Sequence, residues 1–318
     1  MSTVQSSSLP LPSGELLHTI SLTSPQAGPT VVVTANIHGD EVTGLGVVHN
    51  LVRCLPGLLL RGSVHLYPSL NPGGLAAGTR ALPADGQDLN RRFPGKARGA
   101  ASDRHAYRIW KDIMSREPDA LLDLHTDVSG AIPYAIVDRV LGRVRTRGLF
   151  SRCIRMAEAS GLTVLREYPR DRYIRFQLDR SLPGTLINSE GIPAITLEVG
   201  PRRQLDPESI AIGTTAALGV LTELGVVNLP APDDPTRHDG GPWRRESGPR
   251  TNHKGVLVPR LRCGDVLERG VPIAEVRTVE GEVLEVLTAR SKGFVVALPD
   301  RSHVVPGVAA ATIAVRDR

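Results

Sequence analysis

The chain of 318 residues has few cysteines, lysines and aromatic residues, and each shortage argues against a class of protein. Its three cysteines, Cys54, Cys153 and Cys263, are far apart and odd in number, which is typical of reduced, buried thiols rather than of a disulfide framework. Lysine occurs only four times, and no basic run or basic–aromatic alternation is present. The sequence therefore does not indicate nucleic-acid binding.

Long apolar stretches are also missing, and none approaches the roughly 18 residues that span a bilayer. The opening residues, MSTVQSSSLPLPSGE, have neither the basic nor the apolar region of a signal peptide, so we expect a cytoplasmic protein. Hydrophobic residues make up 41% and charged residues 22%, which is ordinary for one large globular domain or two unequal ones. The net charge of +5 comes almost entirely from arginine and could favour small anionic substrates.

Residues 30–44 carry the first clear structural signal. Thr30 to Ala35 form a β-branched, apolar run, typical of a strand buried on both faces of a sheet. Helical spacing follows and predicts a helix that starts near Asp40 or Glu41. His38 and Glu41 then lie at the carboxyl edge of the strand, where open α/β sheets place their active sites. Such a pair can hold two positions of a zinc ion, but it is also typical of a surface histidine beside a helix N-terminus.

Strands and helices alternate over roughly the first 225 residues. Further strands are predicted at residues 63–70, 120–124, 162–165 and 193–199, helices at 102–116, 142–160, 183–190 and 207–224, and long loops at 73–95 and 166–180. This alternation predicts an α/β fold, with a mostly parallel mixed sheet flanked by helices.

The composition changes after Leu229. Residues 230–242, PAPDDPTRHDGGP, are rich in proline, aspartate and glycine, which is typical of a linker. Short β-like runs broken by glycines follow, without a helical period. We therefore expect a main domain over residues 1–229, a linker over 230–242 and a smaller C-terminal all-β domain over 243–318.

Three of the predicted strands end in residues that suit metal-assisted hydrolysis. His38 and Glu41 follow one strand, His125 follows another, and Glu198 lies near the end of a third. Two imidazoles and one carboxylate leave one position of a zinc ion open, which is the pattern of a catalytic site. An unpaired carboxylate inside an apolar strand is costly. Glu198 therefore either pairs with a buried arginine or acts as the general base that takes a proton from the attacking water.

The two predicted loops supply further polar groups. Arg80 is a candidate for stabilising the oxyanion that forms when water attacks an amide carbonyl. Asn90 and Arg91 could hold a substrate carboxylate through paired hydrogen bonds, and Arg175 could bind a second acidic group at the mouth of the site. Arginines on loops usually face solvent, so the residue types alone leave each of these roles open.

Four motifs in order resemble the succinylglutamate desuccinylase/aspartoacylase family, whose members are relatives of the zinc carboxypeptidases. The motifs are ANIHGDE, which begins with alanine where a glycine is common, then NPGG with GTR and DLNRRFPG, then DLH, and finally TLEVG. The resemblance covers about residues 30–225 and implies a zinc carboxypeptidase-like fold with one Zn²⁺ per chain. It implies His38, Glu41 and His125 as zinc ligands, Glu198 as general base and acid, Arg80 at the scissile carbonyl, and Asn90 with Arg91 at a substrate carboxylate.

The C-terminal stretch is similar to the lipoyl-domain-like tail of some family members, among them N-acetyl-diaminobutyrate deacetylases. It lacks a lipoylation hairpin, so we expect a wall over the active site or an oligomer contact instead of a carrier. The resemblance implies a zinc-dependent amidohydrolase that removes an acyl group from a small N-acyl amino acid or related metabolite, and a homo-oligomer. Two alternatives stay open: a zinc metallocarboxypeptidase acting on short peptides, and a non-catalytic binding protein that retains the fold.

Overall fold

The structure is a computed structural model that describes residues 2–317 except 129, 143–146 and 234–235. Parts of the helix predicted at 142–160 and of the linker predicted at 230–242 therefore lie outside the described residues. The elements of the first part are β1 (Thr3–Pro10), β2 (Leu16–Thr23), β3 (Thr30–Ala35), α1 (Thr43–Leu58), β4 (Ser63–Tyr67), α2 (Pro72–Ala77), η1 (Leu89–Arg91), α3 (Ala101–Met114), β5 (Ala120–His125) and β6 (Tyr134–Val137). They continue with α4 (Leu149–Ala159), β7 (Thr163–Arg166), α5 (Arg170–Arg175), η2 (Leu178–Arg180), α6 (Leu182–Thr185), η3 (Leu186–Glu190), β8 (Ala194–Glu198) and α7 (Pro207–Glu223). The C-terminal part holds β9 (Trp243–Ser247), β10 (Gly255–Pro259), β11 (Val266–Leu267), β12 (Pro272–Arg277), β13 (Val283–Thr288), β14 (Gly293–Ala297), β15 (His303–Val304) and β16 (Thr312–Arg316).

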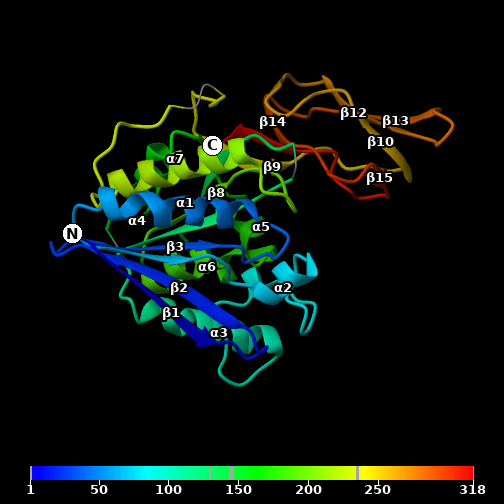
Figure 1. Cartoon of the computed structure of the whole chain (residues 1–318). Helices are drawn as coiled ribbons and strands as arrows, with labels where there is room; N and C mark the ends of the chain where they lie inside the picture. The colour runs from blue at the N-terminus through cyan, green and yellow to red at the C-terminus, as the bar shows by residue number, and fades with distance from the viewer. Residues whose placement is uncertain (1, 129, 143–146, 234–235, 318) are drawn as a thin grey trace.

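A mixed sheet runs through the molecule, and among the described residues it has 12 strands in the order β1-β2-β4-β3-β5-β8-β6-β7-β9-β16-β14-β11. Its centre, β4-β3-β5-β8, is parallel, so the carboxyl ends of β3, β5 and β8 meet at one edge. A separate antiparallel sheet of 4 strands, β13-β12-β10-β15, projects from the main body (Figure 1). This architecture confirms the predicted fold class, including the additional β structure at the C-terminus.

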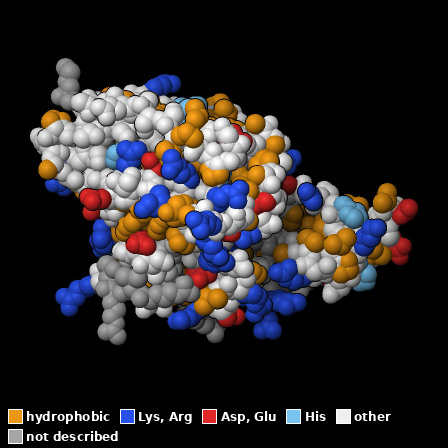
Figure 2. Space-filling view, turned by 90° about the horizontal axis from the view of Figure 1, so that it is seen from below, with side chains coloured by type: hydrophobic (Ala, Val, Ile, Leu, Met, Phe, Trp, Pro, Cys, Tyr) orange, Lys and Arg blue, Asp and Glu red, His pale blue; other side chains and the backbone are white. Residues whose placement is uncertain are grey.

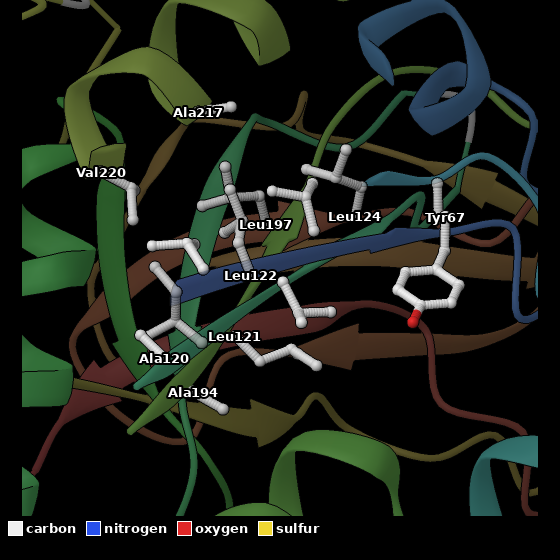
Figure 3. Packing of buried hydrophobic residues seen from close by; sticks show 14 of the residues in the cluster. Tyr67, Ala120, Leu121, Leu122, Leu124, Ala194, Leu197, Ala217 and Val220 are labelled. Atoms are coloured by element: carbon white, nitrogen blue, oxygen red, sulfur yellow. The ribbon is translucent and has the colours of Figure 1, made fainter. Parts of the chain in front are cut away.

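Helices cover both faces of the central sheet, with α1, α4 and α7 along one side and α3 and α6 along the other (Figure 1). The apolar runs of β3 and β5 are buried, as expected for strands covered on both faces. Figure 3 shows side chains of β5 and β8 packed in this core, with Ala217 and Val220 of α7 over one face. Each fully buried leucine or valine there contributes about 1.5–3 kcal/mol, which gives the strand ends a rigid support.

The structure corrects several local predictions. Helix α1 begins at Thr43 instead of at Asp40 or Glu41. The predicted loop 73–95 contains most of α2 and the turn η1. The predicted loop 166–180 contains α5 and η2. Strands β1, β2 and β6 were not expected. Strand β1, TVQSSSLP, is largely polar and exposed and pairs at the sheet edge with β2, so it carries no buried-strand pattern.

The C-terminal part contributes strands to both sheets. Strand β9 pairs in parallel with β7 and antiparallel with β16, and β14 and β11 continue the large sheet from there. The large sheet thus extends from the N-terminal hairpin into the part beyond residue 242. Figure 2 shows the projecting end of the molecule, with arginine and lysine side chains gathered on the body near its base.

None of the described helices combines the length and the apolar character needed to cross a membrane.

Candidate metal centre and adjoining cavity

His38, Glu41 and His125 meet at the carboxyl edge of the parallel strands. One ligand atom from each residue lies within 4.8 Å of the other two, and all three side chains are buried. The Nδ1 atoms of both histidines face Glu41: that of His38 lies 2.9 Å from Oε1, and that of His125 lies 3.0 Å from Oε2. Two nitrogens and a carboxylate in this arrangement form a donor set suited to a divalent metal.

The turn that carries His38 and Glu41 is held by Asn36. The Asn36 side-chain amide donates to the carbonyls of His38, Gly39 and Glu41 at 3.0–3.1 Å, and Asn36 itself has a φ of 53°. Asparagine tolerates this left-handed conformation better than most residues. These bonds hold the segment in a turn, which explains why α1 begins only after Val42.

Gly39 lets the same turn approach α2 closely. A Cβ at residue 39 would lie 2.0 Å from the backbone carbon of Gly74, so any other residue would displace the turn from its neighbour.

Two further carboxylates orient the histidines. Asp88 Oδ1 lies 3.1 Å from His38 Nε2, and Asp123 Oδ2 lies 2.8 Å from His125 Nε2. Asp123 is itself fixed by the Thr34 hydroxyl, which donates to its Oδ1 at 2.7 Å. Carboxylates that hold the outer nitrogen of a ligating histidine fix its tautomer and leave the inner nitrogen free for the metal. The Nδ1 atoms are therefore the ligand atoms that this arrangement presents.

The charge of Glu41 and the free nitrogen of His38 suit a cation bound between the three residues. Burial alone would raise the pKa of Glu41, but His38 and His125 together hold it well below its ordinary value. His38 Nδ1 is buried and has no hydrogen-bond partner of acceptable geometry among the described residues, although Glu41 lies beside it. A bound divalent ion would use this unpaired nitrogen and balance the carboxylate, so the residues present fit the metal that the sequence predicts.

Glu198 lies on the strand next to the metal residues. It ends β8 directly opposite His125 of β5 in the parallel register. Its Oε2 is buried without a hydrogen-bond partner among the described residues. Burial raises the pKa of Glu198 to about 8; His125 opposes this shift, and Asp127 and Glu41 add to it. A carboxylate in this state can accept a proton near neutral pH and give it back.

A cavity of about 310 Å³ opens beside the three metal residues, and we call it the triad cavity. It is lined by His38, Glu41, Arg80, Asn90, Arg91, His125, Thr126, Asp127, Ile136, Asp138, Glu167, Leu178, Ser181, Thr196, Glu198, Arg202 and Arg245. The structure thus brings together seven of the eight predicted site residues. Arg175 is not among the lining residues and lies exposed on α5.

The predicted substrate-binding residues are held by the loop around them. Asn90 Oδ1 accepts from the Leu182 backbone N–H at 2.8 Å, and its Nδ2 lies 3.5 Å from His125 Nε2. Arg91 donates from Nε to the Phe176 carbonyl and from NH1 to the Asn90 carbonyl, both at 2.8 Å. Arg91 is therefore fixed in orientation before any ligand arrives.

Arg80 faces the metal residues. Its NH1 lies 2.8 Å from Glu41 Oε1, and its NH2 lies 3.3 Å from Asp88 Oδ2. The Arg80 guanidinium therefore lies next to the candidate metal residues and also lines the triad cavity.

Sequence reasoning missed several groups that the structure places at the site. Asp123 could have been found, because a buried acid two residues before His125 on a strand faces the same side. Asp88 lies within the quoted motif DLNRRFPG but carried no assigned role. Glu167 and Arg245 gave no signal, because their place depends on the pairing of β7 with β9.

Asp138 provides a test of the charge balance inside the triad cavity. It is buried, accepts from the Tyr173 hydroxyl at 2.6 Å, and its pKa is raised to about 7 by burial and by Glu167. Because the pKa of Asp138 is higher in the folded than in the unfolded protein, Asp138 contributes fully to the free energy of unfolding at low pH. That contribution is lost as the pH rises from the unfolded-state pKa of Asp138 towards 7.

We expect Asp138→Asn to remove this loss of stability at high pH, because asparagine does not ionise. Its amide oxygen can still accept the hydrogen bond from the Tyr173 hydroxyl. The variant should be more stable than the wild type at pH 8 by up to a few kcal/mol, at about 1.4 kcal/mol per unit of pKa shift, and nearly equal at pH 4. Denaturant unfolding at the two pH values measures the difference. A stability difference that is independent of pH would contradict the assigned shift.

Sequence comparison with known proteins agrees with the fold described above. Residues 27–224 match the family model of the succinylglutamate desuccinylase/aspartoacylase catalytic domain. Over 254 residues the chain is 29% identical to the N-alpha-acetyl-L-2,4-diaminobutyric acid deacetylase of Halomonas elongata, covering 78% of this chain and 70% of that protein.

Solved structures show the same architecture. An aspartoacylase family protein of Mesorhizobium loti superimposes with a TM-score of 0.82 at 22% identity, over 100% of this chain and 96% of that one. A metallo-carboxypeptidase of Burkholderia cenocepacia matches 70% of this chain and 65% of its own, with a TM-score of 0.56 and 19% identity. The fold is therefore carboxypeptidase-like, and the chain belongs to the succinylglutamate desuccinylase/aspartoacylase family.

Proposed function

We propose that this protein is a zinc-dependent deacylase that hydrolyses the amide of a small N-acyl amino acid or related metabolite. The observation that carries the proposal is the burial of His38, Glu41 and His125 together, with Glu198 facing the same cavity. Zinc would be held by these three residues and would supply Lewis acidity to the reaction. The deacetylase activity of the Halomonas elongata relative favours an N-acetyl group on the substrate.

The chain's own residues divide the work of amide hydrolysis. Glu198 takes the proton from the attacking water and returns it to the leaving nitrogen, since its position and raised pKa suit both transfers. Arg80 donates to the carbonyl oxygen as negative charge develops there. Asn90 and Arg91, fixed by their own backbone contacts, hold the substrate's carboxylate.

The size of the triad cavity suits a small substrate, and a larger cavity of about 1240 Å³ shares Arg80 and Arg202 with it. The triad cavity's volume of about 310 Å³ lies near the lower end of the range for small-molecule sites, roughly 300–1,000 Å³. The many charged groups of the lining also suit a compact, charged metabolite.

A hydrolysis panel tests this proposal. The zinc-loaded full-length chain is given N-acetyl amino acids, N-succinyl amino acids and short peptides, and the released amine is measured. We expect kcat/KM for the best N-acyl amino acid to exceed that for any peptide at least about 10-fold, a difference of about 1.4 kcal/mol in transition-state binding. Preferential cleavage of C-terminal residues from peptides would favour the carboxypeptidase alternative, and no turnover of any amide would favour a binding protein.

A further inference from the structure

Arg245 lies beyond the predicted linker, yet it lines the triad cavity. Strand β9 carries it, and that strand pairs in parallel with β7 through Leu165 opposite Trp243 and Arg166 opposite Arg244. Because side chains alternate along a strand, Arg245 points to the opposite face from Arg244 and Glu246. The C-terminal part of the chain thus delivers a cation into a site built mainly by the first 225 residues.

Glu167 holds one end of the Arg245 guanidinium, and Nε has no partner among the described residues. NH1 lies 3.3 Å from Glu167 Oε1, and the group lies 5.5 Å from the centre of the Tyr168 ring. Nε is buried and has no hydrogen-bond partner among the described residues. A buried donor without an acceptor is unfavourable. A ligand that supplies an acceptor at the Nε edge of Arg245 would therefore be stabilised there.

Arg91 lines the same cavity and can reach a ligand only with part of its guanidinium. Its Nε and NH1 already donate to the carbonyls of Phe176 and Asn90. Burial lowers the pKa of Arg91; Asp88 and Glu167 oppose this shift, and the positive charges of Arg80 and Arg245 add to it. An anion between the arginines would relieve this repulsion.

We propose that Arg245 binds the carboxylate of the substrate through its Nε edge, together with Arg91 of the same cavity. Two parallel N–H donors match the two oxygens of a carboxylate, and Glu167 fixes the orientation in which Arg245 presents them. This inference rests on the proposed deacylase function and adds a residue of β9 to the contact that Asn90 and Arg91 make with the substrate carboxylate. It also makes β9 a determinant of specificity, beyond the wall over the active site that the sequence predicts.

The test compares Arg245→Gln with Arg244→Gln, a control on the same strand. Arg244 is not among the lining residues of the triad cavity. Its partners keep other arginines after the change, since Glu246 also pairs with Arg172, and Asp317 also pairs with Arg139 and Arg166. Each zinc-loaded protein is assayed with an N-acetyl amino acid and with the methyl ester of the same compound.

Arg245→Gln should lower kcat/KM for the acid roughly 10- to 150-fold, mainly through KM, because a charged hydrogen bond is lost. The ester should change less than about 3-fold, and so should both substrates with Arg244→Gln, since neither loses a contact to a carboxylate. Arg245→Lys should lie between wild type and Arg245→Gln, because lysine keeps the charge but not the paired donors. Equal losses for acid and ester in Arg245→Gln would show that Arg245 only supports Glu167 and would overturn the inference.

A binding measurement separates this inference from the proposed function. Calorimetry with the N-acetyl amino acid and its methyl ester is performed on zinc-loaded proteins that carry Glu198→Gln to prevent turnover. Weaker binding of the acid when Arg245→Gln is added, with ester binding unchanged, supports the carboxylate contact even if the wild type hydrolyses none of the panel. Identical acid affinities with and without Arg245→Gln would refute it.

Discussion

Replacing Glu198 by Gln should reduce kcat at least about 100-fold while the protein keeps its zinc, because the amide preserves the shape of the side chain but cannot accept a proton. Glu198 is buried at the end of β8 opposite His125, and its Oε2 has no partner among the described residues. Steady-state rates with the best N-acetyl amino acid, together with metal analysis of the same sample, measure the effect.

Glu190→Gln provides the matched control, since Glu190 is exposed at the end of η3 and the same chemical change is made there. Its turnover should equal that of the wild type. Near-normal kcat in a fully metallated Glu198→Gln protein would mean that another group moves the proton, and Glu198 would then be a structural residue.

Replacing His125 by Ala should abolish stoichiometric zinc binding and turnover together. The change removes one of the three donors that face one another at the site. Loss of an orienting residue alone typically costs 10–100-fold in metal affinity, so loss of a ligand should cost more than about 100-fold. Metal content after dialysis against a low zinc concentration measures this, and circular dichroism of the metal-free proteins checks that the fold survives.

His18→Ala is the control for that substitution, because His18 is an exposed histidine on β2 and its Nδ1 lies 2.9 Å from the Ser8 hydroxyl, away from the candidate site. It should retain one zinc per chain and full activity. A His125→Ala protein that still holds one tightly bound zinc would require a different set of ligands.

The central strands and the convergence of His38, Glu41 and His125 could be predicted because burial leaves a strong mark on the sequence. Strands β3, β5 and β8 are apolar runs, and the residues that follow or end them, His38, His125 and Glu198, are polar where the run stops. Parallel pairing then brings these ends together at one edge.

The remaining features depend on contacts between distant segments. Strand β1 is polar and exposed, so its pairing with β2 is invisible to a search for buried runs. Arg245 reaches the triad cavity only because β9 returns to pair with β7, which no local pattern records. Arg175 resembled its neighbours in a charged segment, but the helix α5 turns its side chain to solvent. The division into domains at residues 229 and 243 stays a prediction.

The role of the C-terminal part also stays a proposal, which is now that Arg245 of β9 contacts the substrate. Four of its strands, β9, β11, β14 and β16, extend the large sheet, and the other four, β10, β12, β13 and β15, form the projecting antiparallel sheet. A chain that ends near Leu229 would lose β9, the partner of β7, as well as Arg245. Point substitutions such as Arg245→Gln therefore examine its influence on the substrate more cleanly than truncation.

The most direct test of the account is the zinc dependence of N-acyl amino acid hydrolysis by the full-length protein. The protein is stripped with a chelator, assayed, and assayed again after addition of one equivalent of zinc per chain. We predict that stripping lowers the rate at least about 100-fold, as expected when the group that activates water is removed, and that one equivalent restores it. Unchanged hydrolysis by the metal-free protein, or no hydrolysis of any N-acyl amino acid by the reloaded protein, would contradict the account.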